Sequence, residues 1–258
     1  MKAARRGRAV CEHPQPTGPG HRRVKQFSDP HLAALFTLVV GVAASVWGAR
    51  RHPGPWMRWF SIGLAALIFA GWIGEYVADV ILGTWSVQYT LPLQLTDAVS
   101  AVSIAALLTR RQMLVELAYF WSYTASLQAV LTPDLAQNFP SVFYFTYFIY
   151  HVGAIVAASF LVFGCRLYPR RGAVWQVFWI TIGWTAIAGT ADVITGGNYM
   201  YLASKPVHNS LLSLMGPWPW YIAGGFVLGL ALLLLVDGLT KAFGGVPEPR
   251  SVPEPALR

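Results

Sequence analysis

The sequence predicts an all-α integral membrane protein, a polytopic bundle of about seven transmembrane helices. The chain of 258 residues is 55% hydrophobic and 12% charged, and this charged share is about half of that in a soluble globular domain. From residue 31 to residue 241 there are seven acids and ten Lys or Arg, so 17 of 211 positions are charged. Nearly all of them flank long apolar runs, which indicates a membrane-embedded body with two short polar tails.

Each helix is predicted from an apolar run long enough to cross a hydrocarbon core about 30 Å thick, which requires about 20 residues. Pro, Gly or charged residues bound the runs: the first ends before Pro53, the third before Arg110 and the fourth before Pro133. Lipid satisfies no open sheet edge, and the runs are too long for barrel strands, so helices are expected. In chain order the runs are 31–49, 56–74, 90–108, 113–131, 142–164, 173–193 and 219–240.

The distribution of Lys and Arg predicts the orientation. The loops after the first, third and fifth runs carry eight arginines, whereas the loops after the second, fourth and sixth runs carry only Lys205. Cytoplasmic loops are enriched in these residues, so the N-terminus is expected outside and the C-terminus in the cytoplasm of a multi-pass cell (plasma) membrane protein. The basic N-terminal tail, with its seven positive charges, opposes this placement.

The chain divides into a bundle and two tails. Residues 1–27 are a basic Pro/Gly-rich tail expected to be disordered, residues 28–241 form the transmembrane domain, and residues 242–258 form a disordered cytoplasmic tail. A translation start near Val24 is an alternative explanation of the first tail. The net charge is +8, but seven of 19 basic residues lie in the first 25 positions. Membrane lipids, and not nucleic acid, are therefore the expected partners, and the oligomeric state stays open.

Acids gather at the outer ends of the predicted helices, and ionisable groups at membrane depth are functional candidates. Glu75 and Asp79 share a helix face. They predict either a water-filled vestibule or a carboxyl that holds a proton, with solvated helix-end acids as the alternative. The outer acids are Glu75, Asp79, Asp97, Asp134 and Asp192, whereas Glu116 and Asp237 lie near the inner ends.

The segment 91–97 is expected to open the third helix, with Pro92 in its first turn. Gln94 and Asp97 then share a face, while Thr96 is displaced by about 200° from Gln94 on a regular helix. A polar stripe of this kind can serve helix packing as well as chemistry.

His151 lies nine residues into the fifth run, about 13 Å along a helix. At membrane depth it could act as a general base, as a proton relay or only in packing. His31 is expected at the membrane interface or facing the same vestibule. The loop 194–218 is expected to be an ordered lid with Trp218 and Trp220 in the headgroup belt, or a plain aromatic anchor.

Several of these segments carry a family resemblance. The motifs are 26–31 (QFSDPH), 91–97 (LPLQLTD), 127–134 (LQAVLTPD), 197–201 (GNYMY) and 210–221 (SLLSLMGPWPWY). Together they resemble the YwaF-like bacterial integral membrane family from residue 26 to residue 240. That family is distantly similar to a eukaryotic transmembrane phospholipid acyltransferase thought to use Cys and His. Gln94 and Thr96 stand where many bacterial relatives have His and Cys, so no thiol acyl intermediate is available.

Two classes of function follow. The first is an acyltransferase or acyl hydrolase of the outer leaflet, with His151 as base, Thr96 as nucleophile and Asp97 as orienting acid. The second is a small-solute or proton-coupled transporter or a sensor, for which the outer acids favour a cationic ligand. A purely structural bundle is a third reading. No cofactor or metal is expected, since Cys11 and Cys165 lack ligand spacing. The expected substrate-binding residues are His31, Gln94, Asp134, Asp192, Asn198 and Tyr199.

Overall fold

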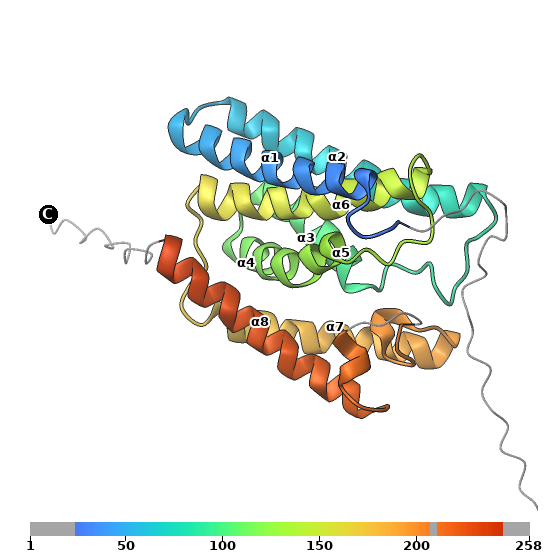
Figure 1. The fold of residues 1–258 in the computed structure, drawn as a ribbon. Coiled ribbons are helices and arrows are strands. Elements are labelled where there is room, and N and C mark those ends of the chain that lie inside the picture. The colour runs from blue at the N-terminus through green and yellow to red at the C-terminus, as the bar shows by residue number, and fades with distance from the viewer. Residues whose placement is uncertain (1–23, 207–210, 245–258) are drawn as a thin grey trace, which may run out of the picture.

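The computed structural model describes residues 24–206 and 211–244, which contain helices and no strand. Figure 1 shows the helices side by side, with α7 and α8 forming a pair beside the rest. The elements are α1 (Asp29–Arg51), α2 (Trp56–Ile81), α3 (Leu95–Thr109), α4 (Gln112–Trp121), π-helix η1 (Ser122–Ser126), α5 (Leu127–Leu131), α6 (Val142–Ser159), π-helix η2 (Phe160–Gly164), α7 (Ala173–Thr195), 3-10 helices η3 (Tyr199–Tyr201) and η4 (Leu211–Leu214), and α8 (Trp220–Gly244).

All seven predicted runs are largely helical, and the all-α prediction is confirmed. In the described part of the chain, five helices are long and apolar enough to cross a membrane, while α3 is a shorter apolar helix. The run 113–131 is a succession of α4, η1 and α5. Seven membrane crossings therefore stay a prediction. The five helices are Asp29–Arg51, Trp56–Ile81, Val142–Gly164, Ala173–Thr195 and Trp220–Ala242.

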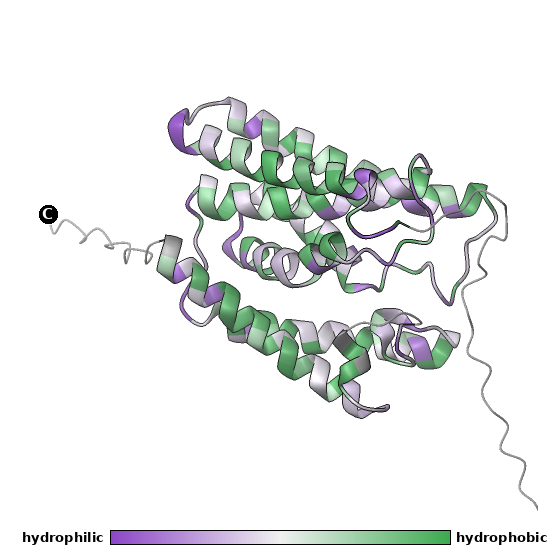
Figure 2. Ribbon diagram, in the orientation of Figure 1, coloured by the Kyte–Doolittle hydropathy of each residue, from purple (hydrophilic) through white to green (hydrophobic). Residues whose placement is uncertain are grey.

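The helix formed by α6 and η2 is the centre of the bundle. In its most apolar stretch 83% of the residues are buried, against 22% or less in the other four long helices. A Cβ atom added to Gly71 would lie 2.6 Å from Ile149, and one added to Gly153 would lie 2.7 Å from Ile68. These two glycines therefore allow α2 and α6 to approach closely. The remaining long helices expose apolar side chains along their length (Figure 2), as expected of a lipid-facing surface.

Two helix boundaries differ most from the predictions. α2 continues to Ile81, so Glu75 lies inside the helix and Asp79 lies in its last turn. α3 begins at Leu95, and Pro92 precedes the helix instead of occupying its first turn. The physical reason is that residues 82–94 satisfy their polar backbone groups through turns, such as the bond from the Thr90 amide to the Ser86 carbonyl at 2.7 Å.

At both ends, the described structure extends beyond the predicted limits of the transmembrane domain, residues 28 and 241. Val24 is buried, and its amide donates to the Leu135 carbonyl at 3.3 Å. The Gln26 side chain donates to the Leu131 carbonyl at 3.0 Å. Residues 24–27 are thus fixed against α5, and α8 extends to Gly244. Residues 1–23 and 245–258 of the predicted tails lie outside the described residues.

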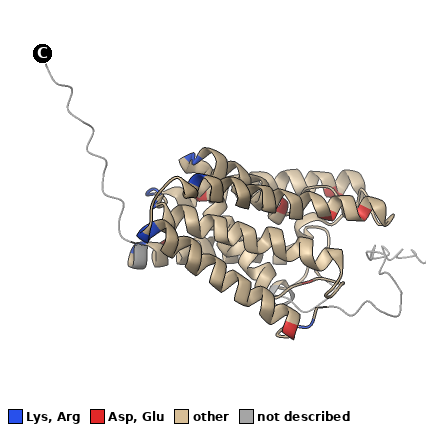
Figure 3. Cartoon of the chain, turned by 90° about the horizontal axis from the view of Figure 1, so that it is seen from above, with Lys and Arg blue, Asp and Glu red and all other residues tan. Residues whose placement is uncertain are grey.

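Charge separates along the bundle. Figure 3 shows most Lys and Arg at one end and most Asp and Glu toward the other. This separation agrees with the predicted orientation, which stays a prediction.

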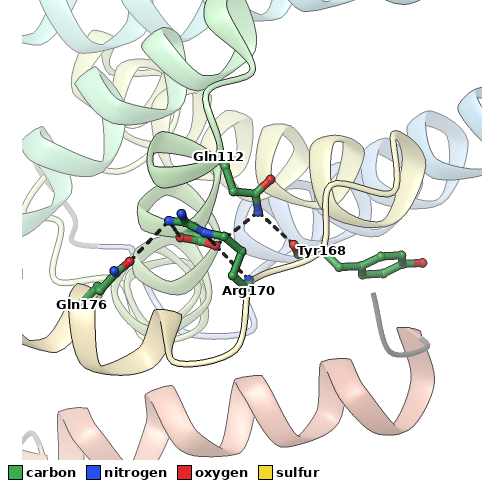
Figure 4. A network of polar contacts seen from close by, with 5 residues as sticks. Gln112, Tyr168, Arg170 and Gln176 are labelled. Carbon is green, nitrogen blue, oxygen red and sulfur yellow. Dashed lines mark hydrogen bonds and ion pairs between the residues drawn. The ribbon is translucent and has the colours of Figure 1, made fainter. Parts of the chain in front are cut away.

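Two acids, Glu116 and Asp237, lie at the basic end, and Asp237 pairs with Lys241 there. Glu116 is held by Arg170. Its buried carboxyl accepts bonds from Arg170 Nε at 2.9 Å, Arg170 Nη2 at 2.8 Å and the Arg170 amide at 2.8 Å. Figure 4 shows Arg170 among Gln112, Tyr168 and Gln176, which extend this network. The bonds to Glu116 raise the pKa of Arg170 above its ordinary value. The network fixes the loop before α7 to α4.

Candidate functional site

A pocket of about 80 Å³ lies at the acidic end of the bundle. Its walls come from α2, α3, α6 and the segment 82–94, four parts of the chain that meet only in the folded structure. Three carboxyl groups and four aromatic side chains share this small space. The lining residues are Trp72, Glu75, Tyr76, Asp79, Tyr89, Thr90, Leu91, Gln94, Thr96, Asp97 and Tyr150.

Asp97 is held by three donors. Its Oδ1 accepts from Trp72 Nε1 at 2.9 Å and from the Tyr76 hydroxyl at 2.7 Å, while its Oδ2 accepts from the Gln94 amide at 2.9 Å. The last bond caps the N-terminus of α3, where a carboxylate also interacts favourably with the helix dipole. Both oxygens are therefore engaged, and Asp97 organises the wall of the pocket.

Glu75 is the pocket acid that has a buried oxygen without a partner. Its Oε2 atom is buried and has no hydrogen-bond partner. Asp97 and Asp79 are close enough to repel its charge, and the Tyr150 hydroxyl approaches its carboxyl group. Asp79, by contrast, accepts a bond from the Thr84 hydroxyl at 2.7 Å. A buried and unpaired carboxyl oxygen in a polar pocket is a group available to a ligand or a proton.

Thr96 lies in the same pocket as Gln94 and Asp97. The displacement of about 200° from Gln94 that a regular helix would give does not apply, because Gln94 precedes the helix in an extended conformation (φ −65°, ψ 150°). No hydrogen bond from a described residue engages the Thr96 hydroxyl.

His151 does not line the pocket. It is 2% exposed, and its ring packs against Tyr147 and Tyr150 at centroid distances of 4.4 and 4.3 Å. Its Nδ1 has no hydrogen-bond partner. Within the described residues no hydrogen bond joins His151 to Thr96 or Asp97, so the predicted catalytic trio is not assembled here.

His31 has a structural place. The ring is fully buried, its Nδ1 accepts from the Phe27 amide at 2.8 Å, and its Nε2 lies 2.8 Å from the Val130 carbonyl. Because Nδ1 accepts, Nε2 must carry the proton and donate. Both ring nitrogens are used by the backbone, which leaves none for a substrate and differs from the expected interfacial position.

The start of the predicted lid is fastened to the rim of the pocket. The buried Tyr199 donates its hydroxyl to the Val87 carbonyl at 2.7 Å and accepts from the Leu91 amide at 2.9 Å. Asp192 fixes the backbone of Tyr199, because its Oδ1 accepts from the Tyr199 amide at 2.6 Å. Burial raises the pKa of Tyr199. A Cβ atom on Gly197 would lie 2.6 Å from the Gln88 carbonyl, so this close approach requires glycine.

The other expected binding residues in this region serve the loop itself. Asn198 uses both ends of its amide within the loop, donating to Ser204 and accepting from the amides of Ala203 and Ser204. Asp134 is exposed and accepts from the Tyr201 hydroxyl at 3.3 Å. Burial, and to a lesser degree the negative charge of Asp134, raise the pKa of the Tyr201 hydroxyl to about 12. Neither Asn198 nor Asp134 lines the pocket.

The far part of the predicted lid is only partly described. Trp218 is exposed and donates to the Leu202 carbonyl at 3.1 Å, and Trp220 is exposed as well. Both positions suit a headgroup belt. Residues 207–210 of the predicted lid lie outside the described residues.

Sequence reasoning missed the aromatic wall of the pocket. Trp72 and Tyr76 lie on α2 three residues before Glu75 and Asp79, respectively, a helical pattern that could have placed all four on one face. In the described ranges, no group of three or more His, Cys, Asp or Glu is arranged to hold a metal ion.

Comparison with known proteins gives one match. A sequence model of the TMEM164 family matches residues 26–237, most of the chain, including every lining residue of the pocket. No curated protein and no solved structure matches the chain. The family consists of transmembrane proteins, in agreement with the five apolar helices described above. The chain belongs to the TMEM164 family.

Proposed function

We propose that the protein is a lipid-active membrane enzyme that transfers or hydrolyses an acyl group of a lipid in the outer leaflet of the cell membrane. The observation that carries the proposal is that Thr96 lines a polar pocket together with Glu75, which has one buried carboxyl oxygen without a partner. A hydroxyl beside a proton acceptor is the minimal arrangement for acyl transfer through a covalent intermediate. The resemblance to the narrower YwaF-like family supports this role, because Thr96 stands where relatives carry Cys.

Gln94 supplies a hydrogen-bond donor for this chemistry. Its Oε1 accepts from the Met200 amide at 2.9 Å, so its Nε2 is the end left to donate into the pocket. An amide N–H near a reacting carbonyl stabilises the negative charge that develops on its oxygen. Asn198, the other side-chain amide among the expected substrate-binding residues, is engaged within its own loop, so Gln94 takes this role.

Acyl exchange in liposomes tests the proposal. The full chain is reconstituted with a phospholipid that carries a deuterated acyl chain and with a lysophospholipid acceptor, and the products are measured by mass spectrometry. Thr96→Val keeps the shape and removes the hydroxyl, so the rate should fall by about 100-fold or more. The matched control is Thr109→Val at the other end of α3, whose hydroxyl donates to the Ala105 carbonyl at 2.7 Å and accepts from the Arg111 amide at 3.4 Å. A Thr96→Val protein that keeps the wild-type rate would refute the proposal.

The role of His151 is tested in the same system. His151→Ala is compared with wild type by lipidomics of the host cell at equal protein expression. Identical lipid profiles would count heavily against any part for His151 in the chemistry.

The composition of the pocket favours a second candidate, a transporter or sensor for a cationic solute. Three carboxyl groups line the pocket, and none of its described lining residues is basic. Buried like charges require a counter-charge or a proton, which a cationic ligand would provide. Uptake of labelled methylammonium by proteoliposomes, compared with Glu75→Gln, tests this candidate. The absence of both flux and saturable binding would remove it.

A further inference from the structure

The group that shares the pocket with Thr96 is not the base that the sequence predicts. His151 is absent from the lining and packs against two tyrosine rings. Asp97 has both oxygens engaged by donors. Glu75 lines the pocket and keeps one buried carboxyl oxygen without a partner. A general base must be able to reach the proton that it removes. Of the acids that line the pocket, Glu75 is the one with a buried carboxyl oxygen that lacks a partner, while Asp79 bonds Thr84 through its Oδ1.

We propose that Glu75, and not His151, is the general base that activates Thr96; this inference rests on the acyl-transfer function proposed above. The Thr96 hydroxyl proton passes to Glu75 Oε2 while Thr96 Oγ1 forms a bond to the ester carbonyl carbon of the lipid. Collapse of the tetrahedral adduct breaks the ester C–O bond, and the leaving alcohol takes the proton from Glu75. Glu75 then accepts a proton from the second alcohol, or from water, whose oxygen attacks the carbonyl carbon of the acyl-Thr96 ester. Collapse of this second adduct breaks the bond between Thr96 Oγ1 and the acyl carbon, and Thr96 Oγ1 takes the proton back from Glu75.

The surroundings of Glu75 fit this exchange of protons. Asp79 and Asp97 place two further carboxyl groups near it. Transfer of a proton to Glu75 removes one of these repelling charges at the moment when negative charge develops on the substrate oxygen. That oxygen can face the Nε2 atom of Gln94, whose other end is fixed by Met200. Negative charge is therefore lost from the cluster of three carboxyl groups and develops on a substrate oxygen that the Gln94 amide can stabilise.

Glu75→Gln, assayed by acyl exchange and by covalent labelling, tests the inference. The full chain in liposomes is incubated with the deuterated phospholipid and quenched, and the peptide that contains Thr96 is examined for the mass of the acyl group. Glu75→Gln should lower both labelling and turnover by about 100-fold or more, the range for loss of a general base. His151→Gln should stay within about tenfold of wild type. The matched control is Asp237→Asn, an acid of α8 at the opposite end that pairs with Lys241.

Two further measurements separate a chemical role from a structural one. Gln is nearly isosteric and removes a buried, unpaired charge, so Glu75→Gln should melt at the wild-type temperature or above it while its activity falls. If Glu75→Gln does not fold, Glu75→Asp replaces it and should keep a measurable fraction of the rate with an unchanged pH profile shape. In wild type the rate should fall as pH decreases because the base becomes protonated, and in Glu75→Gln this acidic limb should disappear.

The possible results have distinct meanings. Loss of labelling in Glu75→Gln with retention in His151→Gln supports the inference. Turnover of Glu75→Gln within threefold of wild type, or loss in His151→Gln alone, overturns it and leaves the acyl-transfer function standing. Failure of wild type to form acyl-Thr96 or to exchange acyl groups overturns both.

Discussion

Removal of the Tyr199 hydroxyl should release the loop after α7 from the rim of the pocket. In Tyr199→Phe the Val87 carbonyl loses a donor at 2.7 Å and the Leu91 amide loses an acceptor at 2.9 Å. A buried group left unpaired costs about 1–3 kcal/mol. Because two groups are affected and water can reach part of this rim, we expect a local loss of about 2 kcal/mol.

Native-state hydrogen exchange measures this local loss. A decrease of about 2 kcal/mol corresponds to exchange about 30-fold faster, at about 1.4 kcal/mol per factor of ten. The acceleration should appear in segments 82–94 and 196–206 and not in α6. The matched control is Tyr147→Phe, which loses one bond, to the Ala129 carbonyl at 2.9 Å, outside this rim. Exchange in 82–94 that stays within twofold of wild type would refute the view that Tyr199 holds the two segments together.

Three further predictions concern the rest of the molecule. Gly71→Val should destabilise the bundle by about 1–3 kcal/mol through overpacking against Ile149, measured as a lower melting temperature; an unchanged value would show that α2 and α6 are not closely packed. Arg170→Gln should cost about 2–3 kcal/mol, because it leaves the buried Glu116 carboxylate without its counter-charge while Arg170 itself is 52% exposed and partly screened by water, and denaturation in detergent checks this value. Burial raises the pKa of Cys165, so less thiolate is present at neutral pH; in a Cys11→Ser background, alkylation should be slower than that of glutathione and should accelerate at higher pH.

The helices were predictable because their pattern is local. An apolar run bounded by Pro, Gly or Arg predicts a helix in lipid, because the side chains face an apolar environment and the backbone hydrogen bonds form within the same segment. The ends were less predictable because they depend on partners elsewhere. Gln94 stays outside α3 while its side chain accepts from Met200, more than a hundred residues away, and nothing near position 94 signals that bond.

The candidate site was predicted in part for the same reason. Gln94, Thr96 and Asp97 were selected from one short segment, and all three line the pocket. His31 and His151 were selected as ionisable groups at membrane depth, which is a property of the residue type and not of its neighbours. In the structure His31 is engaged by two backbone groups, and His151 lies between tyrosine rings. Residue type identified polar groups in the membrane region, but only the packing of helices determines which of them share a space.

The same packing links the loop to the proposed chemistry. Met200 fixes the Oε1 atom of Gln94, and Tyr199 fixes the Leu91 amide, so one short turn of the chain positions two residues of the pocket wall. If Gln94 Nε2 stabilises the oxyanion, release of this turn in Tyr199→Phe should reduce turnover more than lipid binding, because the donor is then less precisely placed. A loss confined to KM would instead mean that the turn only admits the substrate. The loop is thus expected to act as part of the site and not only as its cover.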